Sequence, residues 1–233
     1  MNQINYSTFV DDNVYSNNVI NLLFRIIIKW AKPFKCSSIE FLLTGSRLLK
    51  TYNFDSDIDG IVVLHKMEND ECNIQELKQF YGSSNNDLCI YSNSGNLECN
   101  DRSLYCYLCK LRKNMHARNR IIELYKGKIK FDISFVINEE KTITNSSPIK
   151  NLNKKELELL IEKFIQKLEL LNKYKGLPEF EEKIREKRSQ IYSLASYNSN
   201  KIMLNIINTN NNINKFQFIT KTLKLWAKSK LVF

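Results

Sequence analysis

Two aspartates one residue apart, Asp57 and Asp59, have the spacing that says most about the chemistry of this chain. They introduce the apolar run at residues 60–64, which is typical of a buried strand. Side chains at positions i and i+2 of a strand project from the same face, so both carboxylates can share a pair of divalent cations. Such a pair stabilises the attacking and leaving oxygens of a phosphoryl displacement. Gly45-Ser46, which ten residues separate from Asp57, can form a turn that wraps phosphate oxygens.

A third carboxylate is expected, because a two-metal site for nucleotidyl transfer usually needs a ligand for the cation that activates the attacking hydroxyl. Asp132 is the candidate, since it lies in an alternating polar and apolar segment at residues 128–137. A charged residue amid apolar strand residues must be paired, solvated or bound to metal. Asp55 also has i, i+2 spacing, but we expect it in the polar turn before the strand.

The elements that must position these residues are a mixture of strands and helices. The pattern of apolar residues predicts strands at residues 39–43, 58–64 and 128–137. It predicts helices at residues 19–30, 70–81 and 157–171. Another helix starts with residues 179–191, and a final helix runs from about residue 215 to the C-terminus. A Ser/Thr/Asn-rich connector at residues 138–153 indicates a domain boundary. The pattern predicts an α/β (α+β) fold, with a catalytic domain at residues 1–145 and a helical part at residues 150–233. The N-terminal helix could pack on the catalytic domain or on the helical part.

Composition narrows the function classes. The chain has 233 residues and a formal net charge of +10, which suits a polyanionic partner but is weak support for one. The polar start predicts no signal peptide, and Asn21, Arg25 and Lys29 interrupt the one apolar N-terminal stretch, so no membrane span is expected. Six cysteines in such a chain indicate reduced thiols or metal ligands, and we expect an intracellular protein.

Three segments share the order and spacing of a known family. They are Thr44-Gly45-Ser46-Arg47-Leu48 with Asp57-Ile58-Asp59, then Ile121-Ile122 with the ten residues after it that end on Asp132, and last residues 216–230 with Leu223-Lys224-Leu225-Trp226-Ala227-Lys228. In these segments the chain resembles the eukaryotic poly(A) polymerases, within the nucleotidyltransferase superfamily that includes DNA polymerase beta. The first segment alone fits many nucleotidyltransferases, and the Lys-Leu-Trp-Ala helix narrows the resemblance to the poly(A) polymerases.

The resemblance implies a polymerase-beta-like mixed sheet with helices, followed by the beginning of a helical central domain. It implies that Asp57 and Asp59 ligate two Mg²⁺ or Mn²⁺ ions and that Asp132 ligates the one that activates the RNA 3′-hydroxyl. The implied ATP site comprises Thr44, Gly45, Ser46, Asn53, Asp57, Asp59, Asp132, Lys224 and Phe233. The implied partners are ATP, an RNA 3′ end and cleavage and polyadenylation factors, and the implied location is the nucleus.

The chain also departs from this family. Phe233 stands where the family has a tyrosine, and Leu194-Ala195-Ser196 stands where it has Leu-Asn-Gly, with Asn198 as a substitute only after a register shift. The sequence stops before the family's Gly-Gly-Val loop, so the resemblance covers the catalytic domain and the opening of the central domain. Two stretches, at residues 82–112 and 150–190, are longer than the family usually has.

The expected activity is transfer of AMP from ATP to RNA 3′ ends. Two alternatives stay open: another terminal RNA nucleotidyltransferase, such as a uridylyltransferase, and a degenerate, non-catalytic RNA-binding or partner subunit. Residues 201–233 hold six lysines and no acidic residue, so the face with Lys221, Lys224 and Lys228 favours phosphate contact over an ordinary amphipathic helix.

A zinc site is a further alternative. Cys106-x-x-Cys109 has zinc-like spacing, and Cys89, Cys99 and His116 lie in or beside the same stretch. The segment reads equally well as apolar core with free thiols, and no second CxxC accompanies it. We expect His65, which follows the aspartate strand, at the surface and not as a ligand.

Overall fold

A mixed five-stranded sheet forms the centre of the molecule. The computed structural model describes residues 14–35, 38–52, 56–66, 80, 104, 115–118, 121–126, 129–140, 148–209 and 212–230. The strands are Ser38–Leu43 (β1), Ile58–His65 (β2), Met115–Arg118 (β3), Ile121–Lys126 (β4) and Ile129–Asn138 (β5), in the order β1-β2-β5-β4-β3. Only β2 and β5 pair in parallel. The predicted α+β class is confirmed, whereas β3 and β4 were not predicted.

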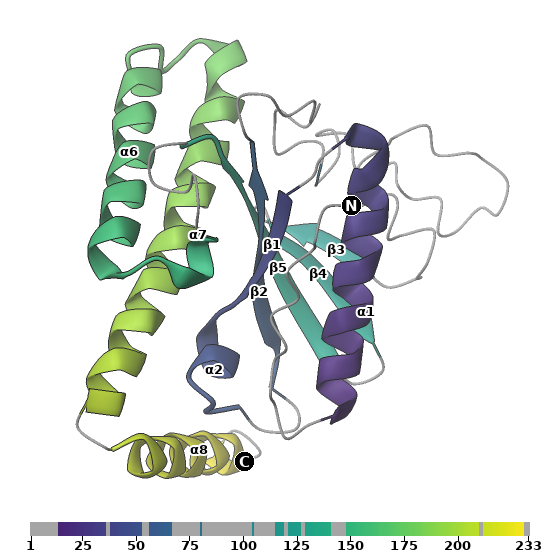
Figure 1. Ribbon diagram of the computed structural model, residues 1–233, viewed down its shortest axis with the longest axis vertical. Coiled ribbons are helices and arrows are strands. Elements are labelled where there is room, and N and C mark those ends of the chain that lie inside the picture. The colour runs from purple at the N-terminus through teal and green to yellow at the C-terminus, as the bar shows by residue number, and fades with distance from the viewer. Residues whose placement is uncertain are drawn as a thin grey trace, which may run out of the picture.

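Helices lie on both sides of this sheet (Figure 1). They are Val14–Ala31 (α1), Gly45–Leu48 (α2), Lys154–Asn172 (α6), Pro178–Thr209 (α7) and Ile213–Lys230 (α8), with 3₁₀ turns at Lys32–Phe34 (η1) and Ile149–Asn151 (η4). The helix predicted at residues 70–81 lies outside the described residues except for Phe80. No helix in the described ranges is both long enough and apolar enough to cross a bilayer.

Helix α1 covers one face of the sheet. Its apolar side chains recur at helical spacing, and Ile20, Ile27 and Trp30 are buried against Phe131 and Phe135 of β5 and their neighbours. The ring of Phe41 lies directly over the Cα of Gly60, so any side chain at that position would clash with it. This face therefore packs as one aromatic-rich core around the middle of β2 and β5.

Helices α6 and α7 cover the opposite face. Leu157, Leu160 and Phe164 of α6 and Leu194 of α7 share a hydrophobic core with strand side chains, namely Leu42, Ile61, Val63 and Val136. Strand residues alternate between faces, so Ile61 and Val63 meet these helices while Val62 and Leu64 meet the α1 side. The helices beyond the predicted boundary thus share a core with the sheet, and the division at residues 145–150 stays a prediction.

A buried polar cluster ties β1 to the connector before α6. The carboxylate of Glu40 accepts hydrogen bonds from the backbone N–H groups of Ile149 and Lys150, both at 2.8 Å, and lies 3.2 Å from Nε2 of His65. Asn138 contacts Nδ1 of His65 at 3.2 Å. Because Oδ1 of Asn138 accepts from the N–H of Glu140, its Nδ2 faces His65, so His65 accepts at Nδ1 and donates from Nε2 to Glu40. His65 is only 4% exposed, so its predicted surface position is wrong.

Candidate active site

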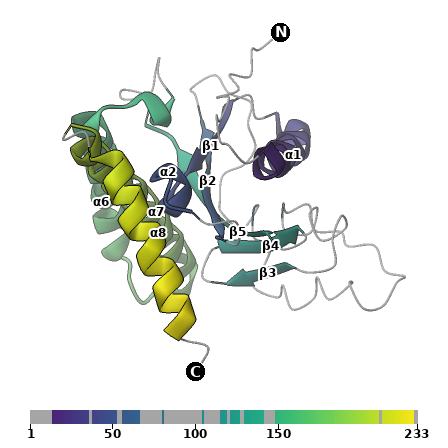
Figure 2. The same ribbon diagram turned by 90° about the horizontal axis from the view of Figure 1, so that it is seen from below.

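The parallel pairing of β2 and β5 brings the predicted aspartates together. Asp59 lies directly opposite Asp132 in the register of the two strands. Asp57 precedes Asp59 by two residues, so all three belong to the face that Ile61 and Val63 share farther along β2. They lie at the N-terminal ends of the two strands, beside α2 and the helix α8 that crosses this end of the molecule (Figures 1 and 2).

The turn at Gly45, where α2 begins, fits closely against Asp59. Gly45 has a φ of +58°, which residues with side chains rarely adopt, and an added Cβ would clash with the carboxylate of Asp59. The N–H of Thr44 donates to the backbone carbonyl of Asp59 at 3.0 Å, and the N–H of Thr51 donates to that of Ser46 at 2.9 Å. Glycine at this position therefore lets the Gly45-Ser46 turn and the aspartate strand lie in contact.

A lysine lies among the carboxylates. The Lys130 ammonium donates to Oδ2 of Asp132 at 2.9 Å and lies 3.7 Å from Oδ2 of Asp57. Its side chain and that of Asp132 are about a quarter exposed (24% and 23%). The hydrogen bond to Asp132 is the main cause that raises the pKa of Lys130 above its usual value, so Lys130 stays charged.

Asp59 is under electrostatic strain. Burial is the largest cause that raises the pKa of its carboxyl, and repulsion by Asp132 and Asp57 adds to it. The charges of Lys130 and Lys224 partly oppose this rise. A cation near Asp59 would relieve the repulsion, because it would favour the ionised form of every carboxylate in the group.

The carboxylates fit a divalent-cation site in chemistry and placement. Oδ1 of Asp132 is buried and has no hydrogen-bond partner among the described residues, which leaves one ligand oxygen uncommitted. Hard cations such as Mg²⁺ take carboxylate oxygens, and three aspartates on one face of two adjacent strands supply them. In their present conformations, no three Asp, Glu, His or Cys side chains of the described ranges stand close enough to hold one ion. Side-chain movements, including one of Lys130, would be needed for these carboxylates to hold one ion together.

Helices α7 and α8 complete one side of the site. Nδ2 of Asn200 donates to Oγ1 of Thr44 at 2.8 Å, and Nζ of Lys224 donates to the carbonyl of Thr51 at 3.1 Å. Lys221 lies 5.7 Å from the ring centre of Tyr52. Lys221 and Lys224 of α8 thus face the segment that follows α2, and the predicted contact of this face with phosphate stays a prediction.

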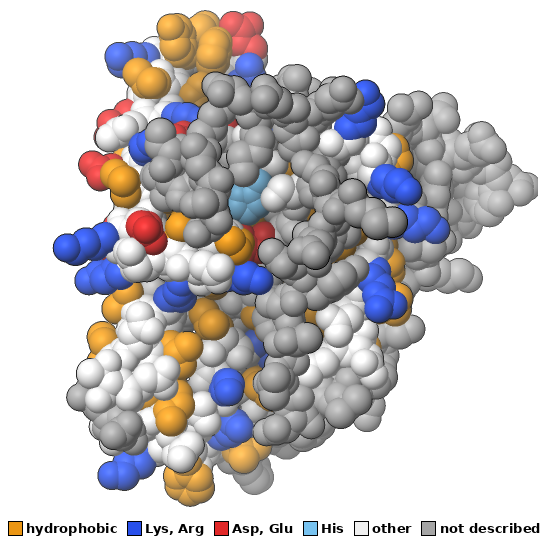
Figure 3. All heavy atoms as spheres, in the orientation of Figure 1, with side chains coloured by type: hydrophobic (Ala, Val, Ile, Leu, Met, Phe, Trp, Pro, Cys, Tyr) orange, Lys and Arg blue, Asp and Glu red, His pale blue; other side chains and the backbone are white. Residues whose placement is uncertain are grey.

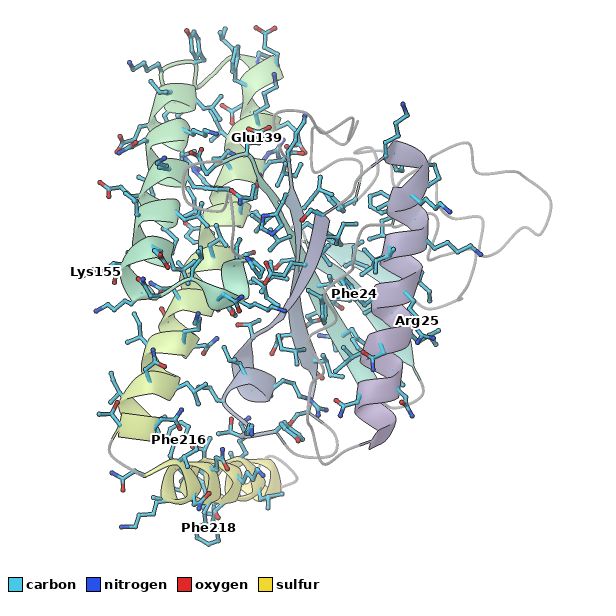
Figure 4. The ribbon with its side chains drawn as sticks, viewed as in Figure 1. Phe24, Arg25, Glu139, Lys155, Phe216 and Phe218 are labelled. Atoms are coloured by element: carbon cyan, nitrogen blue, oxygen red, sulfur yellow. The ribbon has the colours of Figure 1, made fainter. Side chains whose placement is uncertain are left out.

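The apolar side of α8 is exposed, which is the reverse of an ordinary surface helix. Ile219, Leu223 and Trp226 are 55–60% exposed, and Phe218 is 71% exposed and points away from the rest of the molecule (Figure 4). Figure 3 shows hydrophobic and basic side chains interleaved over the end of the molecule where α8 lies. Gln217 donates to the carbonyl of Leu49 and Lys224 to that of Thr51, so polar contacts join α8 to the segment that follows α2.

Several predicted residues cannot be placed. Asn53, Phe233 and the cysteines of the zinc alternative lie outside the described residues, as do the side chains of His116 and Lys228. Of the predicted site, the structure brings together Thr44, Gly45, Ser46, Asp57, Asp59, Asp132 and Lys224.

Three residues of the site were missed by sequence reasoning. Lys130 precedes Asp132 by two residues, so strand alternation alone could have placed it on the same face. Glu123 lies opposite Asp132 in the register of β4 and β5, which required recognition that these two strands pair. Asn200 contacts Thr44 across a long sequence separation, and no local pattern signals such a contact.

No protein-family model and no curated protein matches this chain. What the site can do chemically is therefore argued from its own residues.

Proposed function

We propose that the chain is a polymerase-beta-like nucleotidyltransferase of the poly(A) polymerase type, which transfers AMP from ATP to the 3′ end of an RNA. The observation that carries this proposal is the register that sets Asp59 opposite Asp132, with Asp57 and the Gly45 turn beside them. Carboxylates that repel one another in a partly buried site cost stability, so their gathering at one end of the sheet favours a role in binding cations.

In the proposed reaction, the RNA 3′ oxygen attacks the α-phosphorus of ATP and the bond to the bridging oxygen of the β-phosphate breaks, which releases pyrophosphate. Two Mg²⁺ or Mn²⁺ ions, when bound, supply positive charge for the attacking and leaving oxygens. Asp57, Asp59 and Asp132 would hold them. The Gly45-Ser46 turn would contact the triphosphate, and Lys224 would offset charge on the leaving pyrophosphate.

The remaining parts of the proposal rest on composition and resemblance. The net charge of +10 and the lysines of α8 suit a polyanionic substrate such as RNA. The proposed assembly with cleavage and polyadenylation factors and the nuclear location follow from the resemblance to poly(A) polymerases alone.

The test is incubation of the protein with an RNA oligonucleotide, Mn²⁺ or Mg²⁺ and each nucleoside triphosphate separately. We expect extension with ATP, and a loss of at least about 100-fold in Asp59→Ala because the substitution removes a cation ligand. Glu169→Gln on the exposed side of α6 is the matched control and should retain full activity.

The other outcomes identify the alternatives. Extension with UTP in preference to ATP would indicate a uridylyltransferase. RNA binding with no incorporation of any nucleotide, at protein concentrations well above those of the RNA, would indicate a non-catalytic RNA-binding subunit. Full activity of a correctly folded Asp59→Ala variant would overturn the assignment of the site.

A further inference from the structure

We propose that Lys130 is a built-in competitor of the divalent cations: its ammonium holds Asp57 and Asp132 in the metal-free protein and must release them before the carboxylates can close on metal. This inference rests on the proposed function, since it concerns the same carboxylates. It adds a regulatory residue that the sequence motifs do not include.

The geometry supports competition for the same oxygen atoms. Lys130 donates to Oδ2 of Asp132 and lies near Oδ2 of Asp57, and these are oxygens that an ion shared by the two residues would use. Asp132 keeps its other oxygen buried and without a hydrogen-bond partner in the described part of the chain. One ammonium therefore engages two of the three proposed ligand residues and leaves the set unable to close.

Charge supports the same conclusion. Asp57, Asp59, Asp132 and the neighbouring Glu123 lie close enough that their fields act on one another or on Lys130. Four carboxylates with no cation among them would repel strongly in a partly buried site. Lys130 neutralises part of the negative charge that a divalent cation would otherwise neutralise. Its presence therefore weakens cation binding in two ways, because it occupies carboxylate oxygens and adds positive charge.

The position of Lys130 allows it to move. It lies on the same strand face as Asp132, two residues away, on a long flexible side chain that is 24% exposed. After release, its ammonium would stay on the substrate side of the sheet. A purely structural ion pair would predict the opposite behaviour, namely that loss of Lys130 lowers stability and leaves cation affinity unchanged.

The experiment is a Mn²⁺ titration, followed by electron paramagnetic resonance, of the full chain and of Lys130→Met. We expect the variant to bind Mn²⁺ about tenfold more tightly, because a competing charge within contact distance of the ligands is removed. Lys130→Arg, which keeps the charge, should bind like the parent protein. Lys155→Met, on the outer side of α6 (Figure 4), is the matched control and should not change the affinity.

A second measurement uses the parent protein and does not depend on the folding of a variant. Acetylation of lysines by acetic anhydride, read by mass spectrometry, should increase at Lys130 when Mn²⁺ is added and stay constant at Lys155. Equal Mn²⁺ affinity of the parent and Lys130→Met, or unchanged acetylation of Lys130, would overturn this inference alone. Absence of Mn²⁺ binding by the parent and all variants would instead overturn the proposed function.

Discussion

Gly45 combines a left-handed backbone conformation with close contact to the carboxylate of Asp59. Gly176 also has a positive φ, of +98°, but there is open space where its Cβ would be. The two glycines therefore separate backbone strain from steric contact, which makes them a matched pair for mutation.

Gly45→Ala should lower the free energy of unfolding by about 1–3 kcal/mol more than Gly176→Ala, because only the first adds a clash to the backbone strain. Urea denaturation of both variants measures the difference. Equal losses would mean that the contact between Gly45 and Asp59 does not constrain the turn.

Asp59→Asn should raise the melting temperature in metal-free buffer at pH 7 by about 2–4 °C. A carboxyl whose pKa is raised by folding favours the folded state only below its ordinary pKa of 3.8, and that contribution is lost as the pH rises through the raised value. The neutral amide avoids this loss. Thermal denaturation between pH 7 and pH 4 should therefore show that the difference in melting temperature between Asp59→Asn and the parent protein narrows on acidification. A difference that widens would contradict this explanation.

At the scale of elements, Glu40 joins β1, the end of β2 and the turn η4 through one buried carboxylate. The N–H groups of Ile149 and Lys150 would lose their acceptor if it were removed. Buried donors without acceptors are costly, so this cluster holds the connector that leads into α6.

Glu40→Ala should lower the free energy of unfolding by about 2–4 kcal/mol, since it leaves two backbone donors and His65 without their acceptor. Chemical denaturation measures the loss. Glu162→Ala, at an exposed position of α6, should stay within about 0.5 kcal/mol of the parent protein. A small effect at Glu40 would show that water replaces the carboxylate.

The sequence predicted the elements with strong periodicity and missed those without it. Strands β1 and β2 were predicted from short apolar runs, β5 from its alternating polar and apolar residues, and the long helices from apolar residues that recur at period 3.6. Strands β3 and β4 are short and rich in charged residues, so no such signal marks them. The contacts of Lys130 with Asp57 and of Asn200 with Thr44 join residues through strand register and helix packing, which depend on tertiary structure and not on local pattern.

At the scale of the whole molecule, α8 presents Lys224 to Thr51, in the segment that follows α2, and apolar side chains to solvent. The double variant Ile219→Ser, Trp226→Ser should leave the free energy of unfolding within about 0.5 kcal/mol, because both side chains are more than half exposed. It should also reduce binding of the dye ANS, which reports exposed apolar surface. Leu194→Ala, in the buried core, should cost about 2–5 kcal/mol. A comparable loss of unfolding free energy in the double variant would mean that the apolar side of α8 is packed.

The placement of Lys130 and Asp132 on one strand has a consequence for the order of folding. Their ion pair joins residues two apart, so it can form within β5 alone, whereas Asp59 meets Asp132 only when β2 and β5 pair. Pairing of distant parallel strands comes late, because the loop between them must close first. We therefore expect the carboxylate of Asp132 to be partly neutralised by Lys130 when β5 docks, which would lower the barrier to bringing Asp59 beside it.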